Sequence, residues 1–296
     1  MTSDTTARQL IQFAEEQFLN ADLCYGHGTD NPHDEAAYLV LGALNIPFDV
    51  IQQIDEPLED SKVRHIQNLI TRRIVDRVPV AYLVNEALFC GMSFYVDERV
   101  IIPRSPLAEL IEEKFAPWVM QRENLRILDI GTGSGCIAIA CAMVFPEADV
   151  DAVDVSEDAV AVGKINVDRH RVSDRVHILR SDLYDNLDEK RYDLIVANPP
   201  YVGSRELAAL PEEYRHEPGT ALHGGQDGLD LVRKILLQSG AHLTETGILV
   251  VEVGNSQEAV VENFPQLPFV WLEFERGGEG VFLLSAEDLT GFSQTG

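Results

Sequence analysis

Residues 125–135 read LRILDIGTGSG, an apolar run that ends at Ile130 and leads into three glycines at alternate positions. The apolar run predicts a buried strand of a parallel sheet. The small apolar residues 136–145 predict a helix, so the glycines form the turn between strand and helix. Glycine allows a ligand to lie against bare backbone at such a turn. The stretch therefore predicts an α/β fold with a ligand-binding loop, although a tight turn without a ligand has the same pattern.

The glycine spacing distinguishes two nucleotide-binding patterns. The dinucleotide fingerprint has its third glycine where this chain has Cys136, which disfavours a nicotinamide dehydrogenase. Alternating glycines preceded by an acid resemble instead the cofactor loop of class I S-adenosylmethionine-dependent methyltransferases. This resemblance implies a Rossmann-like sheet and a cofactor loop that comprises Asp129, Gly131, Thr132, Gly133, Ser134 and Gly135.

Two further acidic residues follow the next two predicted strands. The run from 149 to 153 ends at Asp154, whose carboxylate can accept two hydrogen bonds from a ribose diol. The run from 175 to 179 leads to Asp182 and Leu183, which can bind an adenine amine and pack on its ring. Either acid could instead cap a helix. Because parallel strands end at one edge of a sheet, we expect these residues to lie beside the glycine loop.

A fourth apolar run, residues 193–197, is followed by Asn198-Pro199-Pro200-Tyr201. A planar NH2 group, in a carboxamide or an exocyclic base amine, donates two hydrogen bonds and has a delocalised lone pair. A nucleophilic form of it needs two acceptors, which the Asn198 side chain and the Pro199 carbonyl can provide. The paired prolines stiffen the loop, and Tyr201 can close over the acceptor. Alone the motif could be an ordinary turn, but its place after the other three features favours a catalytic loop.

The 296 residues divide by pattern into two domains and a linker. Residues 1–85 are predicted to form a small helical domain that recognises the substrate. Residues 86–103 are rich in β-forming residues around a glycine and predict a hairpin linker. Residues 104–296 then form the catalytic domain. The third predicted helix carries a basic group that we expect on a solvated face: Lys62, Arg64, Arg72, Arg73 and Arg77.

The last third of the chain predicts the end of the sheet. Runs at 247–253, 269–274 and 281–284 continue it, and a glycine-rich turn between the last two makes one strand antiparallel. Residues 205–228 are too long for a simple strand–helix loop and predict a substrate lid. Before the sheet, residues 107–119 predict a helix, and Arg104 is expected to pair with a nearby acid rather than with a cofactor carboxylate.

The charge balance indicates the kind of partner. The chain has 49 acidic and 23 basic residues and a formal net charge of -26. Naked nucleic acid is bound mainly through Lys and Arg, so this balance argues against DNA and favours a basic macromolecule. Solubility or a salt-tolerant source would explain the same charge.

The four cysteines and eight histidines show no spacing typical of a zinc site, so no metal is expected. The scattered histidines are expected at the surface or as satisfied core residues. Few cysteines favour a reducing compartment. The chain has no charged-then-apolar leader and no apolar run near the roughly 20 residues that span a bilayer, so we expect a cytoplasmic protein that does not enter a membrane.

The chain resembles the glutamine N5-methyltransferases that modify proteins of the translation apparatus. From about Arg99 onward it is similar to the group that includes the release-factor enzyme, but nearly the whole chain resembles the branch that acts on large-subunit ribosomal protein three, the PrmB type. The closer resemblance rests on four motifs: YGHGTDNP (25–32), FYVDERV (94–100), PRSP (103–106) and EYRHEP (213–218). The release-factor branch usually has Pro-Arg-Pro, Asp or Glu, and then Thr-Glu, where this chain has PRSPLA (103–108), which argues against release factors.

The resemblance implies S-adenosylmethionine over residues 131–135, with Asp154 at its ribose and Asp182 and Leu183 at its adenine. A glutamine of a basic large-subunit ribosomal protein, modified before or during assembly, would then present its NH2 to Asn198 and the Pro199 carbonyl for in-line attack. Two alternatives remain open. A DNA adenine-N6 methyltransferase grips a similar NH2 but needs basic grooves, and a ribosome-assembly factor could keep the fold without turnover.

Overall fold

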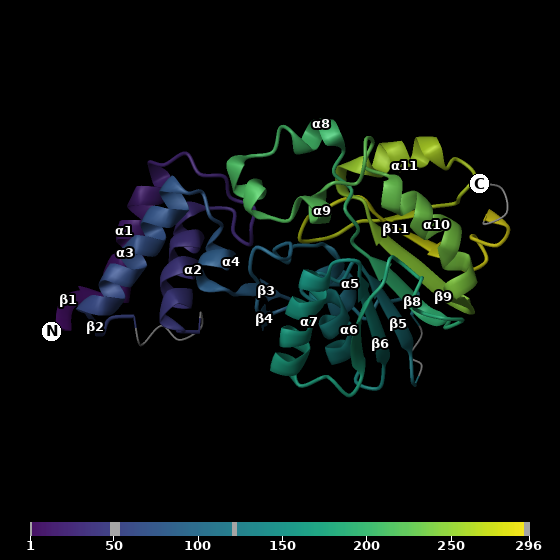
Figure 1. Ribbon diagram of the computed structural model, residues 1–296, viewed down its shortest axis with the longest axis horizontal. Helices are drawn as coiled ribbons and strands as arrows, with labels where there is room; N and C mark the ends of the chain where they lie inside the picture. Colours follow the sequence, from purple (N-terminus) through teal and green to yellow (C-terminus); the bar gives the residue numbers. More distant parts are fainter. Residues whose placement is uncertain (1, 48–53, 120–122, 293–296) are drawn as a thin grey trace.

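The computed structural model describes residues 2–47, 54–119 and 123–292, and these form a helical N-terminal part beside a layered α/β part (Figure 1). Among the described residues of the N-terminal part are the helices α1 (Ala7–Leu19), α2 (Pro32–Leu44), α3 (Asp60–Val75) and α4 (Val80–Val84). The predicted helical character is therefore confirmed. Two short strands, β1 (Thr2–Thr6) and β2 (Pro57–Glu59), pair antiparallel beside the helices. They were not predicted, because such short runs carry too few residues to show an alternating pattern.

Side-chain caps set where the first two helices begin. The Thr6 hydroxyl accepts a hydrogen bond from the Gln9 amide, and the Thr6 amide donates one to the Gln9 side-chain oxygen, so α1 starts with a capping box. The Asn31 side chain caps α2 in the same manner, with Pro32 at the first helical position. Apolar residues at helical spacing then meet in one N-terminal core, which includes Leu39 and Ile66.

A hairpin connects the two parts. Strands β3 (Ala87–Phe89) and β4 (Met92–Phe94) pair antiparallel across a turn at Cys90 and Gly91, which confirms the predicted hairpin. Gly91 has a φ of +69°, a conformation that glycine adopts without strain. The hairpin packs on both sides, because Ala87 belongs to the N-terminal core while Phe89 belongs to the core of the sheet.

The α/β part is built on a seven-stranded sheet of order β10-β11-β9-β8-β5-β6-β7. Its strands are β5 (Arg126–Ile130), β6 (Asp149–Asp154), β7 (Val176–Arg180), β8 (Tyr192–Ala197), β9 (Leu243–Glu252), β10 (Val270–Leu272) and β11 (Val281–Ser285). Neighbouring strands from β7 to β9 are parallel, and β11 is antiparallel to both β9 and β10. The predicted sheet, mostly parallel with one antiparallel strand, is confirmed.

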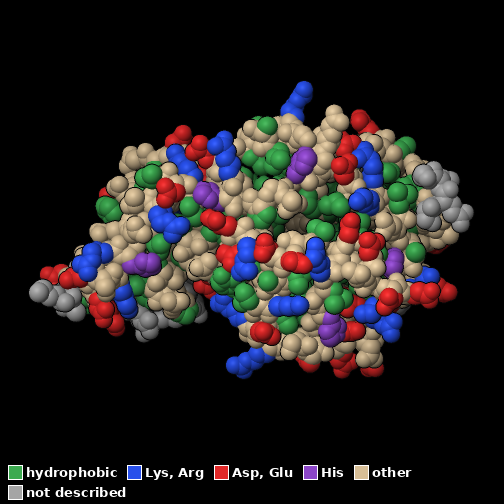
Figure 2. All heavy atoms as spheres, in the orientation of Figure 1, with side chains coloured by type: hydrophobic (Ala, Val, Ile, Leu, Met, Phe, Trp, Pro, Cys, Tyr) green, Lys and Arg blue, Asp and Glu red, His purple; other side chains and the backbone are tan. Residues whose placement is uncertain are grey.

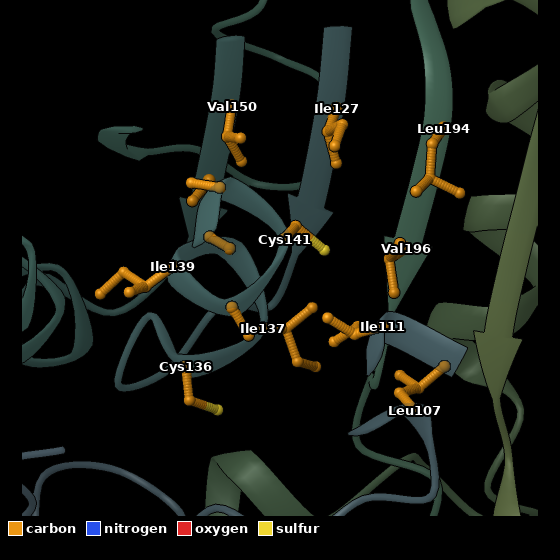
Figure 3. Packing of buried hydrophobic residues seen from close by; sticks show 14 of the residues in the cluster. Leu107, Ile111, Ile127, Cys136, Ile137, Ile139, Cys141, Val150, Leu194 and Val196 are labelled. Atoms are coloured by element: carbon orange, nitrogen blue, oxygen red, sulfur yellow. The ribbon is translucent and has the colours of Figure 1, made fainter. Parts of the chain in front are cut away.

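Helices cover both faces of the sheet. One face packs on α5 (Leu107–Glu112), α6 (Cys136–Val144) and α7 (Glu157–His170), and Figure 3 shows α5 and α6 side chains meeting those of β5, β6 and β8. The other face packs on α10 (Asp230–His242) and α11 (Gln257–Asn263). Residues of the central strands alternate between the two cores, as Ile127 and Leu128 do. The order of strands brings the loops after β5, β6, β7 and β8 to one edge.

The long connection between β8 and α10 runs above that edge and reaches the N-terminal part (Figure 1). It contains α8 (Ser204–Leu207), a 3-10 helix η2 (Glu212–His216) and α9 (Gly219–Leu222). A second 3-10 helix, η3 (Gly254–Ser256), follows β9. The connection thus lies over the site where the sequence places the ligand loops.

Three expectations about single elements were wrong. Helix α5 ends at Glu112 rather than near Val119, because Lys114 and Phe115 have φ values of +57° and +52°, which no α-helix accommodates. Arg73 of α3 is 1% exposed and makes buried ion pairs, so it is not part of a solvated basic face. His27 is buried, and its Nε2 makes no hydrogen bond within the described residues, so it is not a satisfied core histidine.

Candidate active site

The glycine loop after β5 is held against the neighbouring strand. The amides of Gly131 and Thr132 both donate to the Val153 carbonyl of β6, at 2.8 and 3.0 Å. Gly131 and Gly133 have φ values of +73° and +54°, which allow the loop to turn sharply toward α6. The loop therefore offers glycine backbone at the carboxyl edge of the sheet, while the side chains of Thr132 and Ser134 are buried.

Asp129 organises this loop from behind. Its Oδ2 accepts hydrogen bonds from the Thr132 hydroxyl at 2.6 Å and from the Ala138 amide at 3.2 Å. Burial raises the pKa of Asp129 to about 7, because a charge without water nearby is unfavourable. Its Oδ1 is buried and has no partner within the described residues. A buried acceptor without a partner costs free energy, which suits a site completed by a ligand or a water molecule.

Asp154 lies at the end of β6 and faces the loop. One carboxylate oxygen accepts from the Gly133 amide at 3.0 Å, and the other accepts from the Ser156 amide at 2.9 Å. Burial raises its pKa above the ordinary value. The helix cap of α7 is Ser156 rather than Asp154, because the Ser156 hydroxyl accepts from the Ala159 amide. Each carboxylate oxygen keeps a lone pair for a further donor, so Asp154 can still accept from a diol.

These loops surround a cleft that is open to solvent, with an empty space of about 790 Å³. Residues from seven segments line it, and eight of the predicted site residues are among them: Gly131, Gly133, Asp154, Asp182, Leu183, Asn198, Pro199 and Pro200. Four other predicted residues are buried or turned behind the loop and do not line the cleft: Asp129, Thr132, Ser134 and Gly135. Two further segments line it: residues 99–101, which sequence reasoning missed, and residues 218–221, which belong to the predicted lid.

The Asn198 loop separates this cleft from a second cavity, the acceptor cavity, of about 720 Å³. Asn198, Pro199, Ile101 and Ala221 line both, whereas Tyr201 lines only the acceptor cavity. A Cβ atom placed on Gly131 would lie 3.9 Å from the Asn198 carbonyl oxygen, so the first and fourth loops are adjacent. Within the described residues, neither the Asn198 side chain nor the Pro199 carbonyl takes part in a hydrogen bond. Both acceptors are therefore available to a ligand at the junction.

Tyr201 is fixed by residues far away in the chain. Its hydroxyl donates to Glu252 Oε1 at 3.1 Å, and the Ser105 hydroxyl donates to the other oxygen of the same carboxylate. A Cβ atom on Gly254 would lie 2.7 Å from the Tyr201 ring, so only glycine allows the ring to pack there. Burial raises the pKa of Glu252 to about 7, although both hydrogen bonds favour its charged form.

Sequence reasoning missed Glu252, although a signal was present. Glu252 is the last residue of β9, the strand beside β8. The rule that located Asp154 and Asn198, a polar residue where a parallel strand ends, applies equally to this position.

Arg104 pairs with an acid of the connection above the sheet, as predicted. Its guanidinium group donates to both oxygens of Glu217 at 2.6 Å, and it lies over the Tyr214 ring, 5.3 Å from the centroid. Burial opposes the charge of Glu217, but the hydrogen bonds and charge of Arg104 outweigh it and lower the pKa of Glu217 to about 2. Arg104 and Tyr214 both line the acceptor cavity. The pair therefore helps to fix a wall of that cavity.

The same connection is anchored in the N-terminal part. Glu213 of η2 accepts from Arg73 of α3 at 3.2 Å and from the Cys24 amide at 3.0 Å. Arg73 also pairs with Glu35 of α2, and all three charged side chains are buried. A charge pair removed from water is weak evidence of stability but fixes geometry, because losing either partner leaves a buried charge.

The part of the chain that the structure describes contains neither a metal-binding cluster nor a helix able to span a membrane. Residues 2–47, 54–119 and 123–292 contain no group of three or more His, Cys, Asp or Glu placed to hold a metal ion. Among the same residues, no helix has both the length and the apolar character that crossing a bilayer requires. The site described above is thus formed by backbone groups, carboxylates and the Asn198 loop.

Known proteins align in sequence with nearly the whole of this chain. A family model described as a methyltransferase small domain matches residues 113–211. A protein of Neisseria meningitidis serogroup A named ribosomal protein uL3 glutamine methyltransferase is 46% identical over 289 residues, which cover 97% of this chain and 95% of that protein. A Francisella tularensis protein of the same name is 44% identical over 286 residues, which cover 96% of this chain and 91% of that protein.

Solved structures share the fold at much lower identity. The catalytic domain of hMettl16, in a crystal structure with the MAT2A 3'UTR hairpin 1, aligns with a TM-score of 0.51 and 19% identity over 77% of this chain and 82% of that one. At this identity the alignment bears on the fold alone, and it supports a class I methyltransferase architecture.

Proposed function

The chain belongs to the family of ribosomal protein uL3 glutamine methyltransferases, and from this membership we propose how its site works. It transfers a methyl group from S-adenosylmethionine to the side-chain amide nitrogen of a glutamine in uL3, the large-subunit ribosomal protein three. The observation that carries the proposal is the pair of free acceptors, the Asn198 side chain and the Pro199 carbonyl, where the cleft meets the acceptor cavity.

The residues of the cleft suit S-adenosylmethionine. Asp154 would accept hydrogen bonds from the ribose hydroxyls, and Asp182 with Leu183 would bind the adenine. Asp129 holds the loop from behind through Thr132 and Ala138, and its unpartnered Oδ1 can accept from a water molecule there. When bound, the cofactor supplies an electrophilic methyl group.

Asn198 and Pro199 prepare the acceptor amide for attack. Each accepts one hydrogen bond from the glutamine NH2, which draws both hydrogens away from the methyl donor and holds the nitrogen at the cavity junction. Tyr201, fixed by Glu252, forms one wall of the acceptor cavity, and Tyr214 with Arg104 forms another. No strong base is needed before attack, since the nitrogen loses its proton readily only after it is alkylated.

The two parts of the chain are assigned different roles. Residues 1–85 recognise the substrate, residues 86–103 link the parts, and residues 104–296 carry out the transfer. The helices of residues 1–85 pack in a core that is largely distinct from the cores of the sheet, although Ala159 and Val162 of α7 join it, and this supports the division. The formal charge of -26 favours a basic ribosomal protein and speeds their encounter, and Figure 2 shows acidic side chains on both parts of the molecule. We place the reaction in the cytoplasm, where ribosomal proteins are made.

The experiment is methylation of separated ribosomal proteins. The full-length protein is incubated with S-adenosylmethionine carrying a labelled methyl group and with the large-subunit proteins, and duplex DNA serves as the control acceptor. We expect label in uL3, at a single glutamine identified by peptide mass spectrometry. Label in DNA, or in a release factor in preference to uL3, would refute the proposal.

A further inference from the structure

A groove between the two parts of the chain has no role in the reaction described so far. It encloses about 810 Å³ beside the YGHGTDNP motif. Its apolar lining comes from α2, from the hairpin and from the segment after it: Ala37, Tyr38, Leu41, Leu88, Ile102 and Pro103. Leu88 on β3 is 49% exposed, so an apolar side chain is presented to solvent at the edge of this groove.

The YGHGTDNP motif forms one wall of the groove. His27, Gly28 and Thr29 line it, and the Thr29 hydroxyl donates to Glu35, which holds the wall against α2. Gly26 and Gly28 have φ values of +144° and +107°, so the wall depends on backbone conformations that side chains disfavour. The motif, which the cofactor cleft and the acceptor cavity leave unused, therefore has a structural role in shaping this groove.

The rim of the groove is acidic. Asp34 lines the groove, and Asp30 follows Thr29, another lining residue, in the motif. Both aspartates are exposed, and neither forms an ion pair within the described residues. Their only side-chain partner there is the amide of Asn31. An apolar groove with an uncompensated negative rim is complementary to an apolar side chain flanked by Lys or Arg.

The groove lies next to the acceptor cavity. His27 of the groove packs against Tyr214 of the acceptor cavity with 4.5 Å between ring centroids. The segment 101–104 also runs between the two sites, since Ile102 and Pro103 line the groove while Ile101 and Arg104 line the acceptor cavity. One layer of side chains thus separates the two sites, a distance that about three to five extended residues can span.

We propose that this groove is a second binding site for the substrate polypeptide, and that it holds an apolar side chain about three to five residues from the acceptor glutamine, next to a basic residue. The inference rests on the proposed function, because it takes the occupant to be the same basic polypeptide that carries the glutamine. A second, separate partner is disfavoured by the shared wall, which continues from the groove to the acceptor cavity.

The test compares two exposed leucines in the full-length protein, one in the hairpin and one in the N-terminal part. Leu88→Asp places a charge in the groove, whereas Leu19→Asp changes a leucine that is 63% exposed at the end of α1 and lines no cavity described above. Both side chains are exposed, so we expect both variants to fold. We expect Leu88→Asp to raise the KM for uL3 tenfold or more with unchanged affinity for S-adenosylmethionine, and Leu19→Asp to match the wild type.

A photocrosslinking side chain at position 88 gives an independent readout. We expect it to crosslink uL3 within about six residues of the methylated glutamine, because the groove and the acceptor cavity share one wall. A KM for Leu88→Asp within twofold of the wild type, or a crosslink far from that glutamine, would overturn the inference while uL3 is still methylated. Absence of uL3 methylation by the wild type would instead refute the proposed function itself.

Discussion

The cofactor cleft and the acceptor cavity share the Asn198 loop but are built by different means. The cleft is formed by short loops that each follow a strand, and its key contacts join residues close in sequence or on neighbouring strands, such as Gly133 with Asp154. The acceptor cavity is assembled from residues more than a hundred positions apart, such as Arg104 with Glu217 and Ser105 with Glu252. The first site depends on backbone and topology, and the second depends on buried charge pairs.

Because of this difference, substitutions in the two sites are expected to affect the binding of different ligands. Changes in the acceptor cavity are expected to weaken its walls and the binding of polypeptide while leaving cofactor affinity intact. Changes in the cleft are expected to do the reverse. Each variant below is therefore judged on both ligands.

Arg104→Met should have the largest effect, because the buried carboxylate of Glu217 loses both guanidinium hydrogen bonds and keeps only the Ile102 amide and the nearby His27 ring. We expect a loss of about 3 to 5 kcal/mol in the free energy of unfolding near neutral pH, measured by urea unfolding. The loss should shrink between about pH 4.5 and pH 2, since the lowered pKa of Glu217 contributes stability only while that group is ionised in the folded protein.

The matched control for Arg104 is Arg233→Met. Arg233 also donates to both oxygens of one carboxylate, that of Asp227, but this pair is partly exposed. We expect a loss of about 1 kcal/mol or less, as for surface pairs. Equal losses for the two variants would mean that burial does not distinguish the acceptor cavity.

Asn198→Ala tests the loop that both sites share. We expect the turnover of uL3 to fall by about a hundredfold or more, because the acceptor amide loses one of its two hydrogen-bond acceptors. Affinity for S-adenosylmethionine, measured by calorimetry, should stay nearly unchanged. An equal loss of cofactor affinity would assign Asn198 to the cleft instead.

Asp154→Ala tests the cleft alone. We expect S-adenosylmethionine to bind more weakly by roughly 1.5 to 3 kcal/mol, as for a lost hydrogen bond to a charged group. The KM for uL3 should not change. The cofactor affinity of Asp154→Asn should lie between those of the wild type and of the alanine variant, because its amide oxygen still accepts one hydrogen bond. Unchanged cofactor affinity in the alanine variant would leave Asp154 with a purely structural role in the loop.

Glu252→Gln should change how stability depends on pH. Burial raises the pKa of Glu252 to about 7, so the folded protein keeps a proton that the unfolded chain releases at lower pH. The contribution of Glu252 to the stability of the wild type should therefore be lost as pH rises from about 4.5 to about 7, and removing this group should flatten that fall by about 3 kcal/mol. Asp129→Asn is the matched variant in the cleft, since burial raises the pKa of Asp129 to about 7 as well. An unchanged slope in Glu252→Gln would contradict the expectation.

The sequence predicted the fold and the cleft well, because both follow from local patterns. The strand order placed Asp154, Asp182 and Asn198 at one edge, and the structure puts all three in the lining of the cleft. The family resemblance and the class I architecture are confirmed by the relatives. The individual roles of the site residues stay predictions that the variants above test.

The acceptor cavity was largely hidden in the sequence. Glu217 and Arg104 lie 113 positions apart, and no local pattern indicates which acid an arginine will meet. Arg73 was misassigned for the same reason, because its helical position gave no sign that Glu35 and Glu213 would bury it. Long-range charge pairs are fixed by packing, whereas glycine turns and strand ends are encoded where they occur.

The anchoring of η2 has a consequence for protein engineering. Glu213 belongs in sequence to the catalytic half, yet its carboxylate lies among groups of the helical half, Arg73 and the Cys24 amide. A chimera that exchanges the helical halves of two related enzymes at the hairpin would thus separate Glu213 from these donors. We expect retargeting to succeed only when the exchanged unit is discontinuous and carries residues 212–217 along with the N-terminal segment.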